Sequence, residues 1–563
     1  MNILNRYISI VAANKKYQFW LFFAILFLLS LFMIFCYDPI YRGHDFYFHF
    51  RRLSALADSF RDGTFPAYID YKSAHNYGYL SNTFYSDIIL VPFAALSLIT
   101  STLFAYNFML FTMTLLCGVL MYKAINKIYH NSFAAFISAL IFTFCSYRLF
   151  DIYNRGALGE ALAFTFFPLI LLGLYYIIQG DYKRKWYVLV IGYTLMIYTH
   201  VLSSVIVFAT TILFFIIYNK PLRKEPKRLY YLILSGVATL FLIAYYLLPM
   251  LEQMMSNSFY YQSESWADPT LYSTSPYWLL LGLTEGLTKP EQFFFPKIGL
   301  LLTLGVCLRI FVYGKPKKLR GVDIFVIVGL IFLFLTSTLC PWDKFPFTGL
   351  RIIQFPWRLF AFVSFFFAIA EGYYLSQIIK SKKQMTIAAI GITLFISLII
   401  IGDSQNYKKI CYPERIALDT PSLVNNYLGG GKEYLPSKAS AEKLEIRGEK
   451  VTANNADTEI NNLTREGRFT YLDVTISKAD NIELPLIYYK GYKVTLNDKE
   501  IPINESENGL IQINVNQSGR VEAYYAGTIL QHVSFWITIL SIVALCIYWH
   551  ISRKKISTDE PIK

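Results

Sequence analysis

The sequence predicts an α-helical polytopic membrane protein of about twelve spans, with a small extracytoplasmic β-sandwich-like domain near the C-terminus. Three observations support this prediction. Charged residues make up only 16% of the chain, whereas soluble globular proteins carry about 25%. The apolar residues gather in blocks such as 19–37, which has no charge and is long enough to cross a bilayer core of about 30 Å. Residues 403–527 lack such blocks.

The basic residues predict the orientation of the spans. Lys15 and Lys16 place the N-terminus in the cytoplasm, and further basic groups mark later cytoplasmic loops at 183–185, 220–228, 315–320, 380–383 and 553–555. The net charge of +14 follows from these loops, because the basic residues are scattered rather than gathered on a nucleic-acid surface. The predicted spans are 19–37, 133–150, 161–178, 187–200, 201–218, 230–249, 297–313, 322–339, 357–378, 384–402 and 529–550.

The twelfth span comes from one of two neighbouring apolar blocks, 84–100 and 104–122. If both crossed the bilayer, every later loop would change sides against its charge, so one of them lies in the interface or re-enters. A miscount within 187–218 is the alternative. Both termini are then cytoplasmic.

This arrangement divides the chain into three parts. Residues 1–402 form a transmembrane domain, 403–527 an extracytoplasmic β domain, and 528–563 a final span with a basic cytoplasmic tail. The transmembrane domain exposes four main outside segments, 38–83, 151–160, 250–296 and 340–356.

Alternating short segments predict the β domain. Residues 469–476, 492–496, 510–515 and 521–525 alternate apolar and polar side chains, and Asn-Asp, Glu-Asn-Gly and Gln-Ser-Gly turn signals separate them. This pattern is typical of a small antiparallel sandwich.

The first outside segment places Asp45, His44, His49, Arg51 and Arg52 directly after the first span. Asp45 and His49 are four residues apart, so a helix would place both on one face. That face could carry a general base with an orienting partner or two metal ligands. The alternative is an amphipathic helix that anchors the loop in the interface through its aromatic residues.

Other outside residues also allow two interpretations. Asp62 lies in an Asp-Gly-Thr-Phe-Pro turn and Tyr85 in an aromatic segment, which suits either a sugar-stacking loop or a plain interfacial turn. Arg155 and Glu160 lie near the bilayer edge, where they line a polar pocket or extend to water. His200 lies between two predicted spans, either as a turn residue or as a hydrogen-bonding partner of a substrate.

Two arginines, Arg351 and Arg358, bracket Phe-Pro-Trp in the last outside segment. Guanidinium groups bind phosphate through two parallel hydrogen bonds. An arginine where a span begins on the outer face runs against the positive-inside tendency, which indicates a lipid phosphate ligand. Anchoring in the interface is the alternative.

The sequence lacks several motifs that are typical of nucleotide-binding, hydrolytic and metal sites. It contains no Walker sequence, no GxGxxG after a strand, no GxSxG elbow and no Cys/His metal spacing. The sequence therefore predicts no cofactor, although a divalent metal stays open. The predicted cytoplasmic loops are short, so a donor substrate arrives from the membrane or from outside.

An acidic residue directly after the first of many spans resembles the GT-C class of membrane glycosyltransferases. More narrowly, the chain resembles bacterial YfhO-like proteins and the related membrane proteins labelled 6-pyruvoyl-tetrahydropterin-synthase-related. The matching segments are Gly43-His44-Asp45 with His49, 62–66, Arg155-Gly156-Ala157 with Glu160, 355–358, 433–436 and 484–492.

The resemblance implies an inverting transfer. A polyprenyl-phosphate sugar is the donor, Asp45 acts as base on an acceptor hydroxyl or orients it, and arginines compensate the leaving phosphate. The acceptor is a cell-envelope polymer or a glycolipid. The chain departs from the class in one respect, because Asp45 is followed by Phe46 instead of a second acidic residue.

Two other functions compete with this enzyme. A transporter of lipid-linked intermediates would place ionisable residues at the bilayer midplane and show repeated halves, whereas this chain keeps its charges at the outer edge. A non-catalytic envelope assembly protein would bind glycans through the β domain. Substitution of Asp45 separates the enzyme from the assembly protein.

Overall fold

The structure is a computed structural model that describes residues 14–38, 40, 43–263, 268–284, 296–314, 316, 318–411, 426, 428 and 432–559. Parts of the predicted outside segment 250–296 and of the predicted β domain therefore lie outside the described residues. The chain forms two compact units. The helical unit contains Met1–Phe46, Asn107–Ser235 and Ala267–Ile416, and the β unit contains Tyr47–Tyr106, Gly236–Trp266 and Ala417–Lys563.

Long apolar helices dominate the chain. Within the described residues, seven are long and apolar enough to cross a membrane. They are Lys15–Tyr37, Thr102–Tyr129, Ser132–Arg155, Leu158–Ile178, Pro356–Ile378, Lys382–Lys409 and Ile529–Ser552. An eighth would be the pair α15 (Lys227–Leu242) and α16 (Ala244–Ser256), which is bent by 69°. The chain therefore has the spans of a polytopic membrane protein, while the count of twelve and the side of each terminus stay predictions.

Some of these spans are single continuous helices, and others consist of consecutive short elements. Helix α2 (Lys15–Tyr37), α6 (Thr102–Tyr129), α23 (Lys382–Cys411) and α26 (Ile529–Asp559) are continuous. The span 132–155 joins α7 (Ser132–Thr143), α8 (Ser146–Leu149) and the π-helix η1 (Phe150–Arg155). The span 158–178 joins α9 (Leu158–Ala163), η2 (Phe164–Phe166) and α10 (Phe167–Ile178), and the span 356–378 joins η6 (Pro356–Leu359) and α22 (Phe360–Ile378).

The remaining helices are shorter. In chain order they are α11 (Tyr182–Lys185), α12 (Tyr187–Ile197), α13 (Val201–Ile217), α14 (Asn219–Lys224), α17 (Tyr260–Ser263), α18 (Pro269–Tyr272), α19 (Pro276–Thr284), α20 (Leu300–Cys307), η4 (Leu308–Phe311), α21 (Leu319–Leu335) and η5 (Phe347–Ile353). The predicted spans 187–200, 201–218, 297–313 and 322–339 correspond to α12, α13, α20 with η4, and α21.

The structure distinguishes the two ambiguous apolar blocks. Block 104–122 lies within α6, which is long enough to span. Block 84–100 forms only the short helix α5 (Val91–Leu96) between turns. Pro92 lies at the start of α5 and Thr100 and Ser101 follow it, so no long helix forms there.

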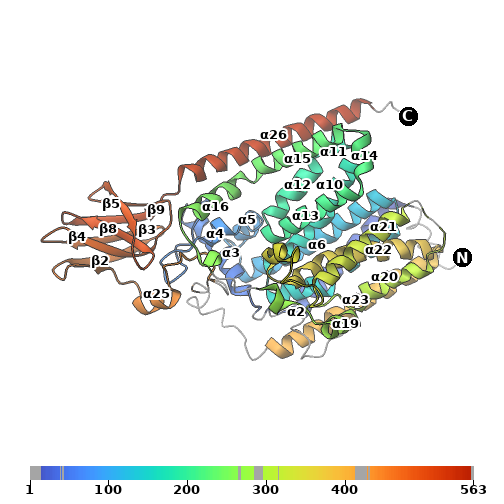
Figure 1. The fold of residues 1–563 in the computed structure, drawn as a ribbon, viewed down its shortest axis with the longest axis horizontal. Coiled ribbons are helices and arrows are strands. Elements are labelled where there is room, and N and C mark those ends of the chain that lie inside the picture. Colours follow the sequence, from blue (N-terminus) through green and yellow to red (C-terminus); the bar gives the residue numbers. More distant parts are fainter. Residues whose placement is uncertain are drawn as a thin grey trace. The chain divides into compact units, whose positions relative to one another are not determined.

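Helix α22 lies at the centre of the helical unit. It packs against α7, α20 and α21, as Figure 1 shows for the last two. Small residues permit the close approach, since a Cβ at Gly372 would clash with the Ser138 hydroxyl. Most of α22 is therefore buried, whereas α2 and α23 expose large apolar side chains such as Phe35 and Leu394. Exposed apolar rows of this kind face lipid in a membrane protein.

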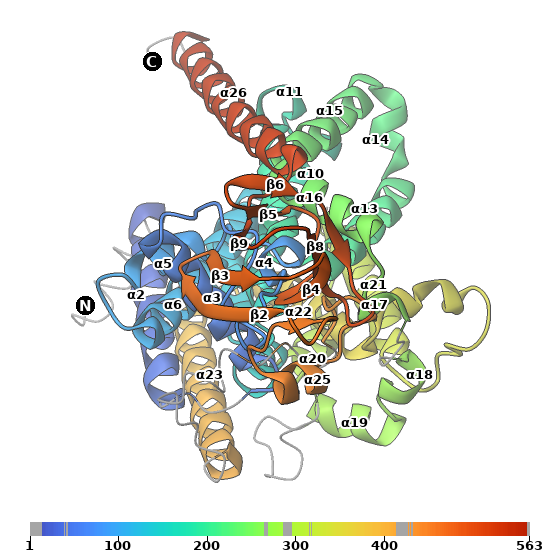
Figure 2. The same ribbon diagram turned by 90° about the vertical axis from the view of Figure 1, so that its left-hand side faces the viewer.

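The β unit contains two antiparallel sheets in its described residues. One has the order β1-β4-β8-β7 and the other β2-β3-β9-β5-β6, and Figure 2 shows strands of both. The strands are β1 (Thr452–Ala453), β2 (Glu459–Glu466), β3 (Phe469–Thr475), β4 (Asp480–Ile487), β5 (Tyr492–Leu496), β6 (Lys499–Ile501), β7 (Ile503–Glu505), β8 (Leu510–Val515) and β9 (Gly519–Tyr525). Helix α25 (Ala441–Arg447) precedes them.

The predicted strands agree closely with β3, β5, β8 and β9. Their inward side chains, such as Leu472, Val494, Ile513 and Val521, are fully or almost fully buried in one apolar core. The segment 68–84 joins the same core, and Ile487 donates a backbone hydrogen bond to the Tyr77 carbonyl at 3.0 Å. The β unit thus also contains α3 (Phe46–Arg61), α4 (Ser81–Phe84), α5, α16 and α26.

Candidate functional site

The predicted site residues fall in both units. Asp45, His44, Arg155, Glu160, His200, Arg351 and Arg358 belong to the helical unit, and His49, Arg51, Arg52, Asp62 and Tyr85 to the β unit. Helix α3 begins at Phe46, so Asp45 lies in the turn before it and the predicted helix face with Asp45 and His49 does not form.

The helical-unit site is built on the end of the π-helix η1. Gly156 ends η1 in the left-handed conformation with φ of 63° and donates its backbone N–H to the Asp151 carbonyl. A π-turn widens the helix by one residue, and such turns are frequent at functional sites. The left-handed residue is a glycine because a side chain there is strained.

The turn after the first span docks on this glycine. The Asp45 backbone N–H donates to the Arg155 carbonyl at 2.7 Å. A Cβ on Gly43 would lie 2.7 Å from the Gly156 nitrogen, and a Cβ on Gly156 would lie 2.8 Å from the Phe46 nitrogen. The two glycines thus let the backbones touch, and this contact fixes Asp45 beside Arg155.

Arg155 is the centre of a buried ionic cluster. Its Nη1 donates to Asp151 Oδ1 at 3.0 Å and to Glu160 Oε2 at 2.8 Å. The Tyr147 hydroxyl donates to Glu160 Oε1 at 2.6 Å. The side chains of Arg155, Asp151 and Glu160 are at most 7% exposed. Arg155 and Glu160 are thus buried partners of one another, and the expectation that they line a substrate pocket stays a prediction.

Arg358 completes the cluster from η6. Its Nε lies 3.4 Å from Glu160 Oε2, and its Nη1 donates to Gln354 Oε1 at 2.9 Å. Two arginines therefore balance two carboxylates among these four residues. Arg351, by contrast, is exposed on η5. Only Arg358 of the predicted arginine pair has a contact with the cluster among the described residues.

His200 is the N-cap of α13. Its Nδ1 accepts from the Ser203 backbone N–H at 3.3 Å and lies 2.8 Å from the Ser203 hydroxyl. Because a backbone N–H can only donate, Nδ1 carries no proton and the imidazole is neutral. The capping role explains the position of His200 without a substrate, so its predicted contact with donor or acceptor stays a prediction.

Asp45 differs from the other carboxylates of the cluster. Its side chain is partly exposed, and no hydrogen bond or ion pair occupies its carboxylate within the described part of the chain. Asp151 and Glu160 are buried and engaged with Arg155. Among the three carboxylates, Asp45 is therefore the one that is not fully buried, and Arg155 supplies a nearby positive charge.

Sequence analysis missed Asp151 and Tyr147. Asp151 and Arg155 are four residues apart, a spacing that places side chains together on a helix. This spacing was the available signal for Asp151. No local signal marks Tyr147, because its partner Glu160 lies beyond the turn at Gly156.

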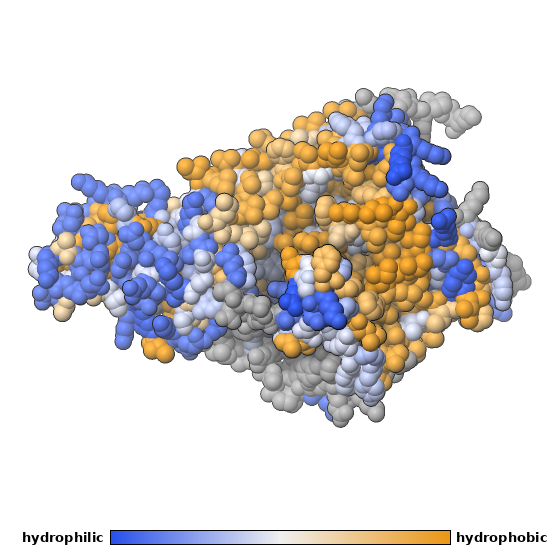
Figure 3. Space-filling view, in the orientation of Figure 1, coloured by the Kyte–Doolittle hydropathy of each residue, from blue (hydrophilic) through white to orange (hydrophobic). Residues whose placement is uncertain are grey.

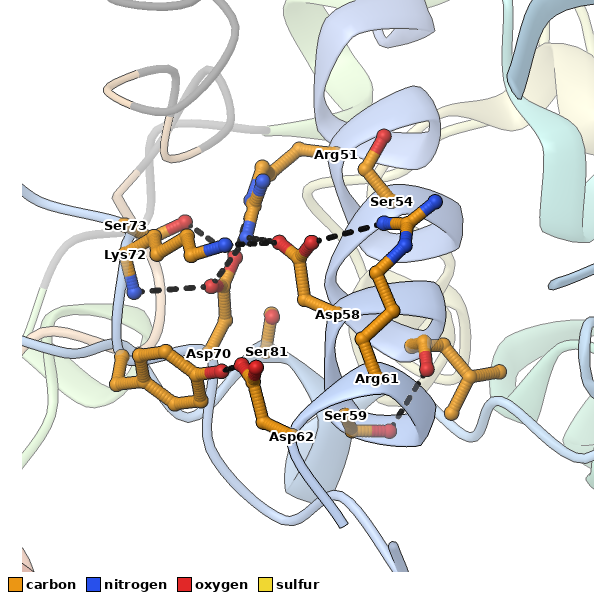
Figure 4. Close-up of polar contacts among 12 residues, drawn as sticks. Arg51, Ser54, Asp58, Ser59, Arg61, Asp62, Asp70, Lys72, Ser73 and Ser81 are labelled. Carbon is orange, nitrogen blue, oxygen red and sulfur yellow. Dashed lines mark hydrogen bonds and ion pairs between the residues drawn. The ribbon is translucent and has the colours of Figure 1, made fainter. Parts of the chain in front are cut away.

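In the β unit, Arg51 organises a second ionic network (Figure 4). Its guanidinium holds Asp70 with two hydrogen bonds at 2.6 and 2.7 Å and contacts Asp58 at 3.2 Å. Burial disfavours the charged guanidinium, but Asp70 and Asp58 outweigh that effect and raise the pKa of Arg51. Asp62 points elsewhere and accepts a hydrogen bond from the Tyr71 hydroxyl.

Arg52 fixes the chain that follows α4. It donates to Asp87 Oδ1 at 2.6 Å and to the Ser86 carbonyl at 2.7 Å, and it lies 4.2 Å from the Tyr85 ring centroid. Burial raises the pKa of the Asp87 carboxyl to about 6, although Arg52 opposes the rise. His49 Nδ1 lies 3.1 Å from Arg52 Nη1, so this nitrogen accepts and the imidazole is neutral.

The hydrogen bonds and ion pairs of Arg51, Arg52 and Asp62 stabilise the fold. They give no information on substrate binding. The substrate contacts of Arg51, Arg52, Asp62 and Tyr85 and the catalytic roles of His44 and His49 stay predictions. Within the described residues, no three His, Cys, Asp or Glu side chains gather as metal ligands.

The glycine contact gives a first testable prediction. Gly156→Ala should lower the free energy of unfolding by roughly 2 kcal/mol or more, because the new Cβ meets the Phe46 backbone and the left-handed conformation is strained. The measurement is the thermal unfolding midpoint in detergent. Gly391→Ala on α23 is the matched control, since its Cβ meets open space. Equal midpoints for both variants would contradict the backbone contact.

Comparisons with known proteins add little to this geometry. No family model matches the chain. The chain is 23% identical to an uncharacterized protein of Lactococcus lactis subsp. cremoris (strain MG1363), over 95% of each chain. The resemblance to YfhO-like proteins therefore stays a prediction.

Among solved structures, the chain is similar to the archaeal oligosaccharyltransferase AglB from Archaeoglobus fulgidus in complex with an inhibitory peptide and a dolichol-phosphate. The TM-score is 0.36 and the sequence identity 13%, over 70% of this chain and 56% of that chain. The chain thus spans little more than half the length of that enzyme. A TM-score this low does not establish a shared fold.

Proposed function

We propose that the chain is a membrane glycosyltransferase that moves a sugar from a polyprenyl-phosphate donor to a cell-envelope polymer or glycolipid on the outer face. One observation carries the proposal. The partly exposed Asp45 carboxylate follows the first span, and a backbone contact fixes it beside the buried Arg155. An accessible base at the membrane edge suits a donor whose lipid tail stays in the bilayer.

The proposed reaction is a single displacement. The acceptor hydroxyl oxygen attacks the anomeric carbon, and the bond from this carbon to the phosphate oxygen breaks. The leaving polyprenyl phosphate takes the electron pair, and the hydroxyl proton passes to Asp45. A positioned base of this kind typically supplies about 10²–10⁴-fold in rate. Attack opposite to the leaving group inverts the anomeric configuration.

The arginines have different parts in this proposal. Arg155 holds the site together through its contacts with Asp151 and Glu160 and places a positive charge near Asp45. Arg351 is exposed and can contact the donor phosphate through its planar fork. Arg358 adds a second positive charge beside Glu160, which already compensates part of it.

The proposal is tested by mass spectrometry of envelope polymers and glycolipids. Cells with the gene, cells without it and cells that carry Asp45→Asn are compared at equal amounts of membrane-inserted protein. We expect a glycan modification that is present with the wild-type gene and lost in both other strains. An Asp45→Asn strain with the full wild-type glycan pattern would favour the non-catalytic assembly protein instead.

A further inference from the structure

A cavity of about 140 Å³ lies within the β unit, and the ionic residues Arg51, Asp58 and Asp70 do not line it. The loop after α3 forms one wall with Thr64, Phe65 and Tyr71. Tyr525 at the end of β9, His532 in the first turn of α26 and Arg468 from the β2–β3 turn also line it. Nothing in the proposed reaction uses these side chains.

Hydrogen bonds fix the walls of this cavity. The Tyr68 hydroxyl donates to the Gln531 carbonyl at 3.1 Å, which ties the loop to α26. The Gln531 side chain donates to the Tyr525 hydroxyl at 2.9 Å and accepts from the Thr528 backbone N–H at 2.8 Å. Because Gln531 is fully buried, these bonds make the cavity a built feature of the unit.

The cavity lies at the start of the candidate span in α26. The candidate span begins at Ile529, three residues before His532. Ile529 and Trp536 are 83% and 62% exposed, and Val533 is also exposed. Figure 3 shows the change of surface at this point, from the hydrophilic strands to the hydrophobic length of α26. The cavity therefore opens at the level where lipid headgroups lie.

Arg468 gives the cavity an uncompensated cation. Two other described arginines of the β domain have carboxylate partners, since Arg447 pairs with Glu483 and Arg465 with Glu449. Within the described residues, Arg468 makes no ion pair. Its guanidinium lies 5.0 Å from the Phe469 ring centroid and 5.5 Å from that of Tyr524. The rings hold the guanidinium over the strands while its N–H groups stay available.

We propose that this cavity binds the anionic headgroup of a membrane lipid. The headgroup phosphate accepts hydrogen bonds from Arg468 and His532, because a guanidinium and an imidazole N–H are the donors at the rim. The tyrosines and Phe65 cover the apolar part of the headgroup. The acyl chains lie along the exposed apolar side chains of α26. A site of this kind docks the protein, or a glycolipid substrate, at the outer face.

The test is a binding measurement on the purified full-length protein in a non-ionic detergent. Fluorescent short-chain phosphatidylglycerol is the anionic probe and the matching phosphatidylcholine is the zwitterionic reference, both followed by anisotropy. We expect at least tenfold tighter binding of phosphatidylglycerol. The double variant R468A/H532A should lose about tenfold or more of this affinity, which is about 1.4 kcal/mol or more. Arg468→Lys should restore only part of it.

Arg520→Ala is the matched control. Arg520 is also a cation without an ion pair within the described residues, and it lies 4.6 Å from the Tyr471 ring centroid, but it does not line the cavity. Its removal should change the affinity less than twofold. Affinities are compared only among variants whose thermal unfolding midpoint equals that of the wild-type protein. If R468A/H532A does not fold, the single substitution Arg468→Glu at this exposed position takes its place.

Two results would overturn the proposal. The first is equal affinity of wild-type protein and of the Arg468 variants for phosphatidylglycerol. The second is complete displacement of the lipid probe by millimolar inorganic phosphate, which would indicate a site for free phosphate. The measurement needs no sugar transfer, so its failure and the failure of the proposed glycosyltransferase activity are separate outcomes.

Discussion

Asp45→Asn should reduce sugar transfer by about two orders of magnitude or more while the protein still folds and reaches the membrane. The amide keeps the size of the carboxylate but cannot take the proton of the attacking hydroxyl. The Asp45 backbone N–H, which docks the turn on Arg155, is untouched by this substitution. The measurement is the initial rate of transfer at saturating donor, normalised to folded protein.

Asp62→Asn is the control for this prediction. Asp62 is an aspartate of the same predicted outside segment and directly follows α3, but its carboxylate accepts a hydrogen bond from the Tyr71 hydroxyl. We expect a much smaller loss of transfer, within about tenfold. A wild-type rate in the Asp45→Asn protein would remove Asp45 from the reaction. A larger loss in Asp62→Asn than in Asp45→Asn would assign the base to Asp62.

Arg155→Leu should destabilise the protein more than any single surface substitution. The change leaves Asp151 and Glu160 buried with only Arg358 to compensate them. Breaking a buried ion pair by removing one partner costs roughly 3–5 kcal/mol. We therefore expect a strongly lowered thermal unfolding midpoint and a low yield of monodisperse protein after extraction in detergent.

A companion triple variant distinguishes this account from simple loss of packing. Arg155→Leu combined with Asp151→Asn and Glu160→Gln removes the uncompensated charges together with the cation. The triple variant should regain part of the lost stability, because neutral amides are less costly to bury than carboxylates. Arg351→Leu, an exposed arginine of the same unit, should change stability by less than about 0.5 kcal/mol. A triple variant as unstable as or less stable than Arg155→Leu would contradict the ionic account.

Much of the architecture could be predicted from hydropathy and alternation. Block 19–37 and strand β5 at 492–496 appear nearly as expected. Strand β2 was missed because it is an edge strand whose polar sequence buries little. Strand β4 was missed because its near-continuous burial and Pro485 hide any alternation. Such features depend on neighbouring strands, which a local pattern does not contain.

The contacts within the candidate site could likewise not be predicted from local sequence patterns. Gly43-His44-Asp45 and Arg155-Gly156-Ala157 both stood out in the sequence, but their contact spans more than a hundred residues and only the fold brings them together. Arg351 and Arg358 looked equivalent in the sequence. The fold pairs Arg358 with Glu160 and leaves Arg351 exposed, because ion-pair partners are chosen by tertiary packing and not by spacing.

The central claim is that Asp45 serves sugar transfer from a lipid phosphate. Its most direct measurement is the release of polyprenyl phosphate from a synthetic polyprenyl-phosphate sugar by purified protein in liposomes, with envelope glycolipid as acceptor. We predict release by wild-type protein that depends on the acceptor, and release by Asp45→Asn protein that is about two orders of magnitude slower. No release by folded wild-type protein with any polyprenyl-phosphate sugar, or equal release by both proteins, would contradict the claim.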